Sequence, residues 1–280
     1  MSAKRLAVIG AGTMGAGIAV VAAVAGCSVQ LVDRVEVHPA AKGRIEKSLA
    51  ALLVRHRLSA DQSAQAMGRI SWSEEVSQLA ATDLVVEAVA EDFELKRQVL
   101  LALRRDFLGL VATNTSSLSV SALAAFAPDP SRFLGLHFFN PPERMVLVEV
   151  VHGAQTSEQT MTEAEAFVSQ IGKQAVRAQD APGFIVNRVA RPIYLEALRL
   201  VGDGAASVEL VDRLIEGLGF PLGPFRLMDL IGIDVNLAVS ESVYRQLMHE
   251  PRLRPHPLQQ RMVNGGALGR KSGRGFYTYA

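Results

Sequence analysis

Two kinds of hydrophobic pattern divide the chain. As far as about Gln179, short apolar and often β-branched runs alternate with longer stretches in which apolar residues recur every three or four positions. This alternation is typical of βαβ units, whose parallel strands are buried between covering helices. The predicted strands are residues 6–9, 29–32, 84–88, 111–113, 133–136 and 147–151, and the helices between them include 14–25, 41–57 and 94–106. The pattern therefore predicts a doubly wound α/β domain.

The pattern changes after Asp180-Ala181-Pro182-Gly183. Helical periodicity then covers residues 184–200, 208–218 and 234–249, no further strand is predicted, and the glycine-rich residues 265–275 are expected to form a loop. We therefore expect two domains, residues 1–182 and an all-α domain of residues 183–280.

Composition narrows the classes of function. Hydrophobic residues make up 49% of the 280 positions and charged residues 20%, which favours packed domains over disorder. The net charge of +1 argues against nucleic-acid binding. The only cysteine, Cys27, excludes an internal disulfide, and no Cys/His cluster has zinc spacing. The longest apolar run, residues 18–25, is too short to span a membrane, so we expect a cytoplasmic protein without a metal ion.

A glycine-rich turn indicates a dinucleotide site. Gly10-Ala11-Gly12-Thr13-Met14-Gly15 follows a predicted strand and opens a predicted helix, the context in which such glycines hold a pyrophosphate against helix N–H groups. Asp33 ends the second strand, where its carboxylate suits ribose hydroxyls and repels a 2′-phosphate. The motif therefore predicts a Rossmann-like domain that binds NAD. Two alternatives are a plain glycine turn, and Arg34 holding the 2′-phosphate of NADP if Asp33 turns away.

An acid/base pair is the second candidate for chemistry. His137 comes at the end of one apolar run, and Glu149 lies in the next run, beyond a turn. If the runs pair as strands, the carboxylate can hold one ring nitrogen and make the other a better base. The alternative is a structural histidine beside a glutamate on the strand face.

Polar residues also follow the strand around Val111. Thr113-Asn114-Thr115-Ser116-Ser117 should lie at the carboxyl edge of the sheet, where open α/β sheets bind ligands. These residue types also suit a helix N-cap. Some residues of the segment can bind a ligand while others cap a helix.

Together these motifs resemble the NAD-dependent L-3-hydroxyacyl-CoA dehydrogenase family, in particular its short bacterial 3-hydroxybutyryl-CoA form. The resemblance covers nearly the whole chain. Its most specific segments are residues 10–15, 112–117, 137–141, 147–150, 181–188 and 269–277.

The resemblance implies oxidation of a (3S)-3-hydroxyacyl-CoA to the 3-ketoacyl-CoA. His137 would be the general acid/base and Glu149 the carboxylate that orients it. Ser116 and Asn187 match residues that hydrogen-bond the reacting oxygen. The positions that match cofactor contacts are Asn140 at the nicotinamide, Glu91 and Lys96 at its ribose, and Lys271 in the tail.

The predicted helical arm near residues 41–58 carries five basic residues and one acid, a local charge of +4. Such a stretch is often only a solvated helix face. The family places CoA contacts on this arm, so Ser48 and Arg55 are candidates for binding the nucleotide part of the substrate.

Because the sequence departs from the family's usual pattern in places, it does not determine which acyl chain the enzyme prefers. Residues 140–146 bring in Glu143 and Arg144, and residues 187–192 with 234–236 are more similar to 3-hydroxyadipyl-CoA dehydrogenases of phenylacetate breakdown. Arg144, Arg188 or Arg191 would then meet a distal carboxylate. The residues are also compatible with a dehydrogenase of a free hydroxy acid and with a non-enzymatic NAD-binding protein. The family resemblance further implies a homodimer through the helical domain.

Overall fold

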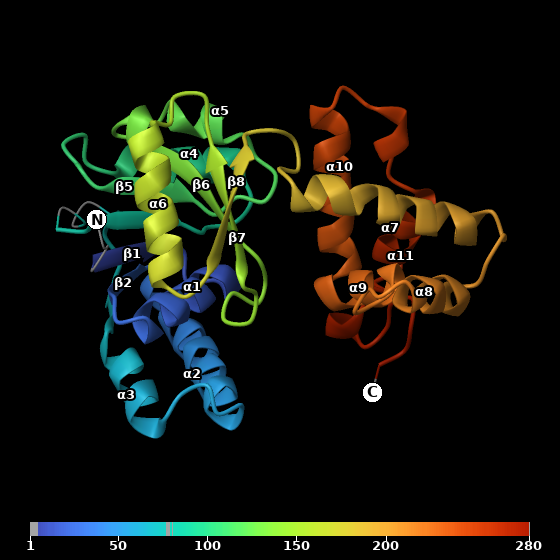
Figure 1. The fold of residues 1–280 in the computed structure, drawn as a ribbon, viewed down its shortest axis with the longest axis horizontal. Helices are drawn as coiled ribbons and strands as arrows, with labels where there is room; N and C mark the ends of the chain where they lie inside the picture. Colours follow the sequence, from blue (N-terminus) through green and yellow to red (C-terminus); the bar gives the residue numbers. More distant parts are fainter. Residues whose placement is uncertain (1–4, 77–78, 80, 280) are drawn as a thin grey trace. The chain divides into compact units, whose positions relative to one another are not determined.

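The computed structural model describes residues 5–76, 79 and 81–279. The chain forms two compact units, residues 1–181 and residues 182–280 (Figure 1).

An eight-stranded sheet organises the first unit, in the order β3-β2-β1-β4-β5-β6-β7-β8. Strands β1 to β6 run in one direction, β7 is antiparallel to β6, and β8 is parallel to β7. The strands are β1 (Arg5–Ile9), β2 (Ser28–Val32), β3 (Ile70–Ser73), β4 (Leu84–Glu87), β5 (Leu110–Thr113), β6 (Phe133–Phe138), β7 (Leu147–His152) and β8 (Gln174–Gln179).

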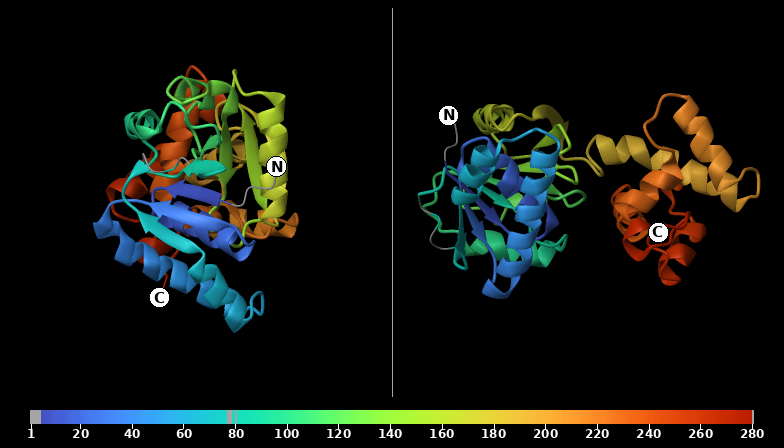
Figure 2. Two further views of the ribbon diagram at one scale, coloured as in Figure 1. Left: turned by 90° about the vertical axis from the view of Figure 1, so that its left-hand side faces the viewer. Right: turned by 90° about the horizontal axis from the view of Figure 1, so that it is seen from below.

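Helices cover both faces of this sheet (Figures 1 and 2). One strand face packs with α1, α2 and α6 in a single buried cluster that includes Val8, Leu31, Ile45 and Phe167. Because side chains alternate along a strand, Glu87, His137 and Glu149 lie on the opposite face. The helices are α1 (Thr13–Val24), α2 (His38–Val54), α3 (Ala60–Gly68), α4 (Phe93–Ala102), α5 (Val120–Ala124) and α6 (Glu158–Gln170).

The doubly wound fold is confirmed, but the pattern missed β3, β8, α3, α5 and α6. Strands β3 and β8 are the sheet edges and remain largely half-buried or exposed, so their sequences lack an apolar run. Strand β6 continues to Phe138, so His137 lies inside the strand instead of after it. The predicted helix of residues 94–106 already ends at Ala102.

The second unit is helical, as predicted. Its buried cluster includes Leu195 and Leu198 of α7, Phe225 and Met228 of α9, and Val243 of α10. The pattern missed α9 and α11, which have eight residues each. No described helix is long and apolar enough to cross a membrane. The helices are α7 (Val186–Gly202), α8 (Val208–Gly217), α9 (Pro224–Ile231), α10 (Ile233–Gln246) and α11 (Pro257–Asn264).

The C-terminal segment, predicted as a loop, is fastened to α9. The buried Asp229 carboxylate accepts hydrogen bonds from the backbone N–H groups of Phe276 and Tyr277, each at 3.0 Å, and from the Tyr279 hydroxyl at 2.8 Å. Within the segment, Arg274 makes isolated bridges to Gly269 and Thr278. A buried carboxylate therefore replaces the sheet partner that this short extended segment lacks.

Candidate active site

The candidate site residues of the first unit gather at the edge of the sheet that is formed by the carboxyl ends of its parallel strands. The chain leaves β1 toward β2 and β3 on one side, while β4, β5 and β6 lie on the other. Ligands bind outside the carboxyl ends of parallel strands at such a switch point. The turn after β1 and the ends of β4, β5 and β6 all lie at this edge, so the topology brings Gly12, Glu91, Ser116 and His137 to the same side.

Each glycine of the turn after β1 has a different surrounding. Gly10 has φ of +100°, and a Cβ there would lie 2.7 Å from the Ala88 carbonyl oxygen. A Cβ on Gly15 would overlap the Gly10 carbonyl oxygen. At Gly12 a Cβ would meet no atom within 4 Å. Packing therefore requires Gly10 and Gly15, whereas the space beside Gly12 is free for a pyrophosphate.

The start of α1 adds to this cradle. Thr13, the first residue of the helix, is exposed and Met14 is half-buried, and no side chain caps the helix. A helix N-terminus favours negative charge, so the turn fits the pyrophosphate of a dinucleotide.

Asp33 joins the end of β2 to this turn. Its Oδ2 accepts a hydrogen bond from the Ala11 N–H at 2.7 Å, and its Oδ1 accepts one from the Arg34 N–H at 2.8 Å. The carboxylate is thus held toward the glycine turn, and each oxygen retains a lone pair for a ribose hydroxyl. Asp33 does not turn away, which disfavours the NADP alternative based on Arg34.

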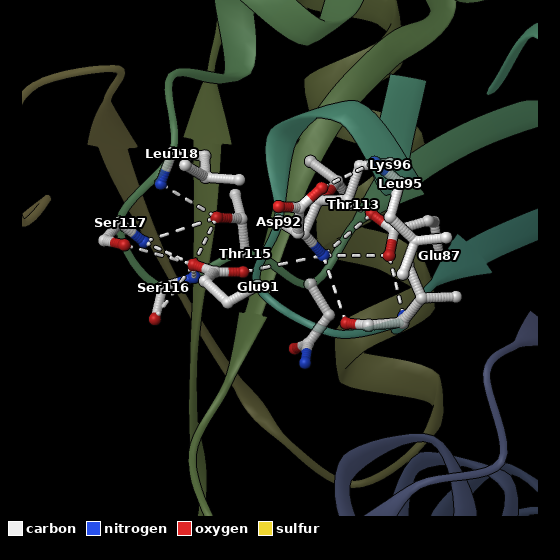
Figure 3. A network of polar contacts seen from close by, with 12 residues as sticks. Glu87, Glu91, Asp92, Leu95, Lys96, Thr113, Thr115, Ser116, Ser117 and Leu118 are labelled. Atoms are coloured by element: carbon white, nitrogen blue, oxygen red, sulfur yellow. Dashed lines mark hydrogen bonds and ion pairs between the residues drawn. The ribbon is translucent and has the colours of Figure 1, made fainter. Parts of the chain in front are cut away.

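A buried charge network lies at the ends of β4 and β5 (Figure 3). The Lys96 ammonium of α4 donates hydrogen bonds to both carboxylate oxygens of Glu87, at 2.8 and 3.0 Å. Glu87 also accepts hydrogen bonds from the Thr113 hydroxyl and the Val89 N–H. Glu87 and Lys96 are fully buried, so each charge depends on the other.

Glu91 orders the turn that carries Ser116 (Figure 3). One carboxylate oxygen of Glu91 accepts hydrogen bonds from the Thr115 hydroxyl at 2.7 Å and from the N–H groups of Ser116 and Ser117 at 2.8 and 3.0 Å. Its other oxygen lies 3.5 Å from Lys96 Nζ. Burial alone would raise the pKa of Glu91, but the Lys96 charge and these hydrogen bonds outweigh it and hold the pKa below its usual value. The contact of Glu91 and Lys96 with a ribose stays a prediction.

His137 and Glu149 meet as the sequence indicated. They are direct partners across the antiparallel β6–β7 pair, and His137 Nδ1 lies 2.6 Å from Glu149 Oε2. Glu149 is fully buried and His137 is 5% exposed. The Phe139 ring packs beside the imidazole, with the ring centroids 4.4 Å apart. The carboxylate therefore fixes the orientation of the imidazole ring through Nδ1.

The helical arm and the loop after β6 form a cavity of about 220 Å³. Ser48, Arg55 and Lys47 line it from the arm, and Glu143 and Arg144 line it from the loop. The Ser48 hydroxyl donates a hydrogen bond to Glu143 Oε1 at 3.2 Å. The structure thus brings together Ser48 and Arg55, the two candidate CoA residues. The Glu143 carboxylate lies in the same cavity among the basic side chains.

The remaining candidates occupy separate positions. Asn140 is exposed just after β6 in the first unit. In the second unit, Asn187 is half-buried in the first turn of α7. Lys271 pairs with Asp234, with Nζ 2.6 Å from Oδ1. The roles of these residues stay predictions.

The sequence reasoning missed Glu87, and for Asn114, which it placed at this edge, it did not predict the contact. Glu87 is the last residue of β4 and carries the buried ion pair. Asn114 follows β5, and its side-chain oxygen accepts a hydrogen bond from the Phe138 N–H at 2.9 Å. A glutamate that ends an otherwise apolar strand, as in Leu84-Val85-Val86-Glu87, was an available signal for the first residue.

Comparison with known families decides the assignment. Residues 5–181 match the NAD binding domain of 3-hydroxyacyl-CoA dehydrogenase, and residues 183–279 match the C-terminal domain of the same enzyme family. The chain belongs to the 3-hydroxyacyl-CoA dehydrogenase family. The resemblance seen in the sequence and the expected NAD-binding domain are thereby confirmed, and the first unit of this dehydrogenase family member is the part that holds NAD.

Relatives within the 3-hydroxyacyl-CoA dehydrogenase family differ in the acyl-CoA that their names give. A 3-hydroxyadipyl-CoA dehydrogenase of Escherichia coli is 43% identical over the whole chain, which spans 60% of that relative's length. A 3-hydroxybutyryl-CoA dehydrogenase of Mycobacterium tuberculosis is 40% identical, and the match covers 99% of this chain and 98% of the relative. The solved structure of an (S)-3-hydroxybutyryl-CoA dehydrogenase from Ralstonia eutropha matches over the full length of both chains, with 39% identity and a TM-score of 0.91.

Proposed function

We propose that this protein oxidises the C3 hydroxyl of a (3S)-3-hydroxyacyl-CoA to the 3-ketone with NAD. The observation that carries the proposal is the buried His137–Glu149 pair, with 2.6 Å between Nδ1 and Oε2, at the sheet edge that also carries the glycine turn. Family membership supports the reaction class.

The residues present fit the cofactor. The open space at Gly12 takes the pyrophosphate, and Asp33 takes the adenosine ribose. When bound, NAD supplies the hydride acceptor at its nicotinamide.

His137 moves the proton in this proposal. Because Glu149 holds Nδ1, Nε2 is the nitrogen that takes the proton from the substrate hydroxyl, and it returns that proton in the reverse direction. The Glu149 carboxylate stabilises the imidazolium formed in between. Ser116 and Asn187 would donate hydrogen bonds to the substrate oxygen while its charge changes.

The finer assignments are part of the same proposal. The names of the relatives favour either a four-carbon acyl chain or a six-carbon chain with a distal carboxylate. The CoA nucleotide would lie against Ser48 and Arg55 in the cavity on the arm. A homodimer through residues 183–280 and a cytoplasmic location also stay predictions, and exposed apolar residues such as Val189, Leu214 and Leu218 offer a dimer surface.

The test is NADH consumption with acetoacetyl-CoA. We expect turnover by the wild type and its loss in His137→Asn, with NADH binding retained in both. Activity with free acetoacetate but not with its CoA thioester would instead indicate a hydroxy-acid dehydrogenase. NADH binding with no turnover of either compound would indicate a non-enzymatic protein and contradict the proposal.

A further inference from the structure

Arg191 is a buried cation in the second unit with no counter-ion among the residues that the structure describes. Its residue exposure is 3%, and none of the described Asp or Glu side chains forms an ion pair with it. Its guanidinium lies over the Tyr194 ring, 4.7 Å from the centroid. Burial lowers the pKa of Arg191 to about 10. A buried charge without a partner is costly, so its presence calls for a reason.

The groups around Arg191 are neutral and come from neighbouring helices. Its Nη1 donates hydrogen bonds to the Asn236 carbonyl and the Ser240 hydroxyl of α10, each at 2.9 Å. The Asn236 side-chain oxygen accepts a hydrogen bond from Gln259 of α11 at 2.8 Å. All these side chains are at least 97% buried. We call Arg191, Asn236, Ser240 and Gln259 the buried polar cluster.

Several polar atoms of the buried polar cluster have no hydrogen-bond partner among the described residues. Arg191 Nε, Asn236 Nδ2 and Gln259 Oε1 are buried without a hydrogen-bond partner among the described residues. Two of these three atoms are donors, and one donor belongs to a positive charge. A guanidinium has two parallel N–H groups along its Nε edge, which is the geometry that binds a carboxylate with two bonds. The cluster therefore suits an anion better than a neutral group.

The position of Arg191 on α7 suggests which anion. Asn187, proposed to bind the reacting oxygen, lies four residues earlier and so on the same helix face. Four residues of α-helix rise about 6 Å. In a six-carbon dicarboxylic substrate, three carbon–carbon bonds separate C3 from the carboxylate carbon, a span of about 4 Å before the C–O bonds at each end are added. One turn of α7 thus matches the distance between the two ends of such a substrate.

We propose that Arg191 is the specificity-determining residue for a carboxylate at the far end of the acyl chain, so that the preferred substrates are dicarboxylic 3-hydroxyacyl-CoA thioesters. This inference rests on the proposed function and names its substrate class. A terminal methyl group at the same place would leave the buried cation unpaired, and a site built for a polar group rejects an analogue without it. Arg144 and Arg188, the other two candidates from the sequence, have no such buried surroundings, since Arg144 is exposed and Arg188 half-buried.

A matched substrate pair tests this in the wild type. In 3-oxoadipyl-CoA and 3-oxohexanoyl-CoA the acyl chains have equal length and differ at C6, which is a carboxylate in one and a methyl in the other. We expect the kcat/KM for NADH-dependent reduction to be at least about 30-fold higher for the dicarboxylic compound. An equal or reversed ratio overturns the inference, while acetoacetyl-CoA turnover separately reports whether the proposed reaction occurs.

Two variants assign the effect to a residue. Arg191→Met is expected to remove most of the preference for 3-oxoadipyl-CoA while acetoacetyl-CoA activity stays within a few-fold of the wild type. Arg188→Met is the control on the same helix and is expected to keep the preference. If Arg191→Met lowers activity with all substrates equally and also lowers the melting temperature, Arg191 is a structural link between α7 and α10, and the inference is wrong. Loss of the preference in Arg188→Met alone would also contradict it.

Discussion

The His137 imidazole and the Glu149 carboxylate face each other across an antiparallel strand pair, with Nδ1 and Oε2 2.6 Å apart. Changing Glu149 to Gln keeps the shape of the side chain but removes the charge that stabilises the imidazolium in the proposed mechanism. We expect Glu149→Gln to lower kcat by about 10²- to 10⁴-fold with little change in NADH affinity. Steady-state kinetics with acetoacetyl-CoA and NADH titration by fluorescence measure the two quantities. A kcat within about threefold of the wild type would show that His137 does not depend on this carboxylate.

The glycines of the turn after β1 should separate folding from cofactor binding. A Cβ at Gly12 meets nothing within 4 Å, so Gly12→Ala should fold normally and weaken NADH binding at least about tenfold by filling the pyrophosphate space. A Cβ at Gly15 overlaps the Gly10 carbonyl, so Gly15→Ala should lower the free energy of unfolding by about 1–3 kcal/mol. Thermal melting and NADH titration of both variants check this contrast. Equal melting temperatures for the two variants would contradict it.

The Glu87–Lys96 ion pair should be a large contributor to stability that depends on both partners. Lys96→Met leaves the Glu87 carboxylate buried and uncompensated, and we expect a loss of about 3–5 kcal/mol in the free energy of unfolding. The double variant Lys96→Met/Glu87→Gln removes the stranded charge and should recover part of that loss. Urea unfolding of the wild type, of the single variants Lys96→Met and Glu87→Gln, and of the double variant gives the coupling energy. Additive losses would mean that the two charges do not compensate each other.

Glu91 should contribute to stability in a pH-dependent way. Its pKa lies below the usual value in the folded protein, because the Lys96 charge and the hydrogen bonds outweigh the effect of burial. The ionised carboxylate therefore stabilises the fold above its unfolded pKa of about 4.3, and this stabilisation is lost as the pH falls through the folded pKa. Glu91→Gln should show a shallower decrease in urea midpoint than the wild type between about pH 5 and pH 3. Glu241→Gln, which changes an exposed residue of α10, is the control and should follow the wild type.

Glu143 is an acid in the cavity predicted to take the nucleotide part of CoA. Its negative charge opposes phosphate binding, so Glu143→Gln should lower the KM for acetoacetyl-CoA by a few-fold, whereas Arg55→Ala should raise it. Both changes in KM should become smaller at high salt, because salt screens the interactions of charges near the surface. If neither variant changes the KM, the CoA nucleotide binds elsewhere.

The parts of the fold that the sequence predicted are those whose burial leaves an apolar pattern. Strands β1, β2, β4, β5, β6 and β7 are mostly buried, so each appears as an apolar run. The edge strands β3 and β8 keep polar residues such as Ser71 and Arg177, which removes that signal. Helix α6 was missed although Ser157 caps it and Met161, Ala164 and Phe167 mark one face, because polar residues fill the positions between.

The site shows the same division. The pairing of His137 with Glu149 was predictable, because two apolar runs separated by a turn have few ways to pair. The contact between Asp33 and the Ala11 N–H was not, since it depends on how closely the end of β2 approaches the glycine turn. That no described acidic side chain pairs with Arg191 was also not predictable from the sequence, because it depends on the packing of three helices and on no local pattern.

The fastening of residues 276–279 by Asp229 makes this extended segment part of the helical core. Two backbone N–H groups and a tyrosine hydroxyl share one buried carboxylate, so clipping these few residues would strand a negative charge inside the second unit. An endoprotease should therefore cut within residues 276–279 only once the unit opens. Proteolytic sensitivity of this segment is thereby a direct reporter of whether the helical unit is intact.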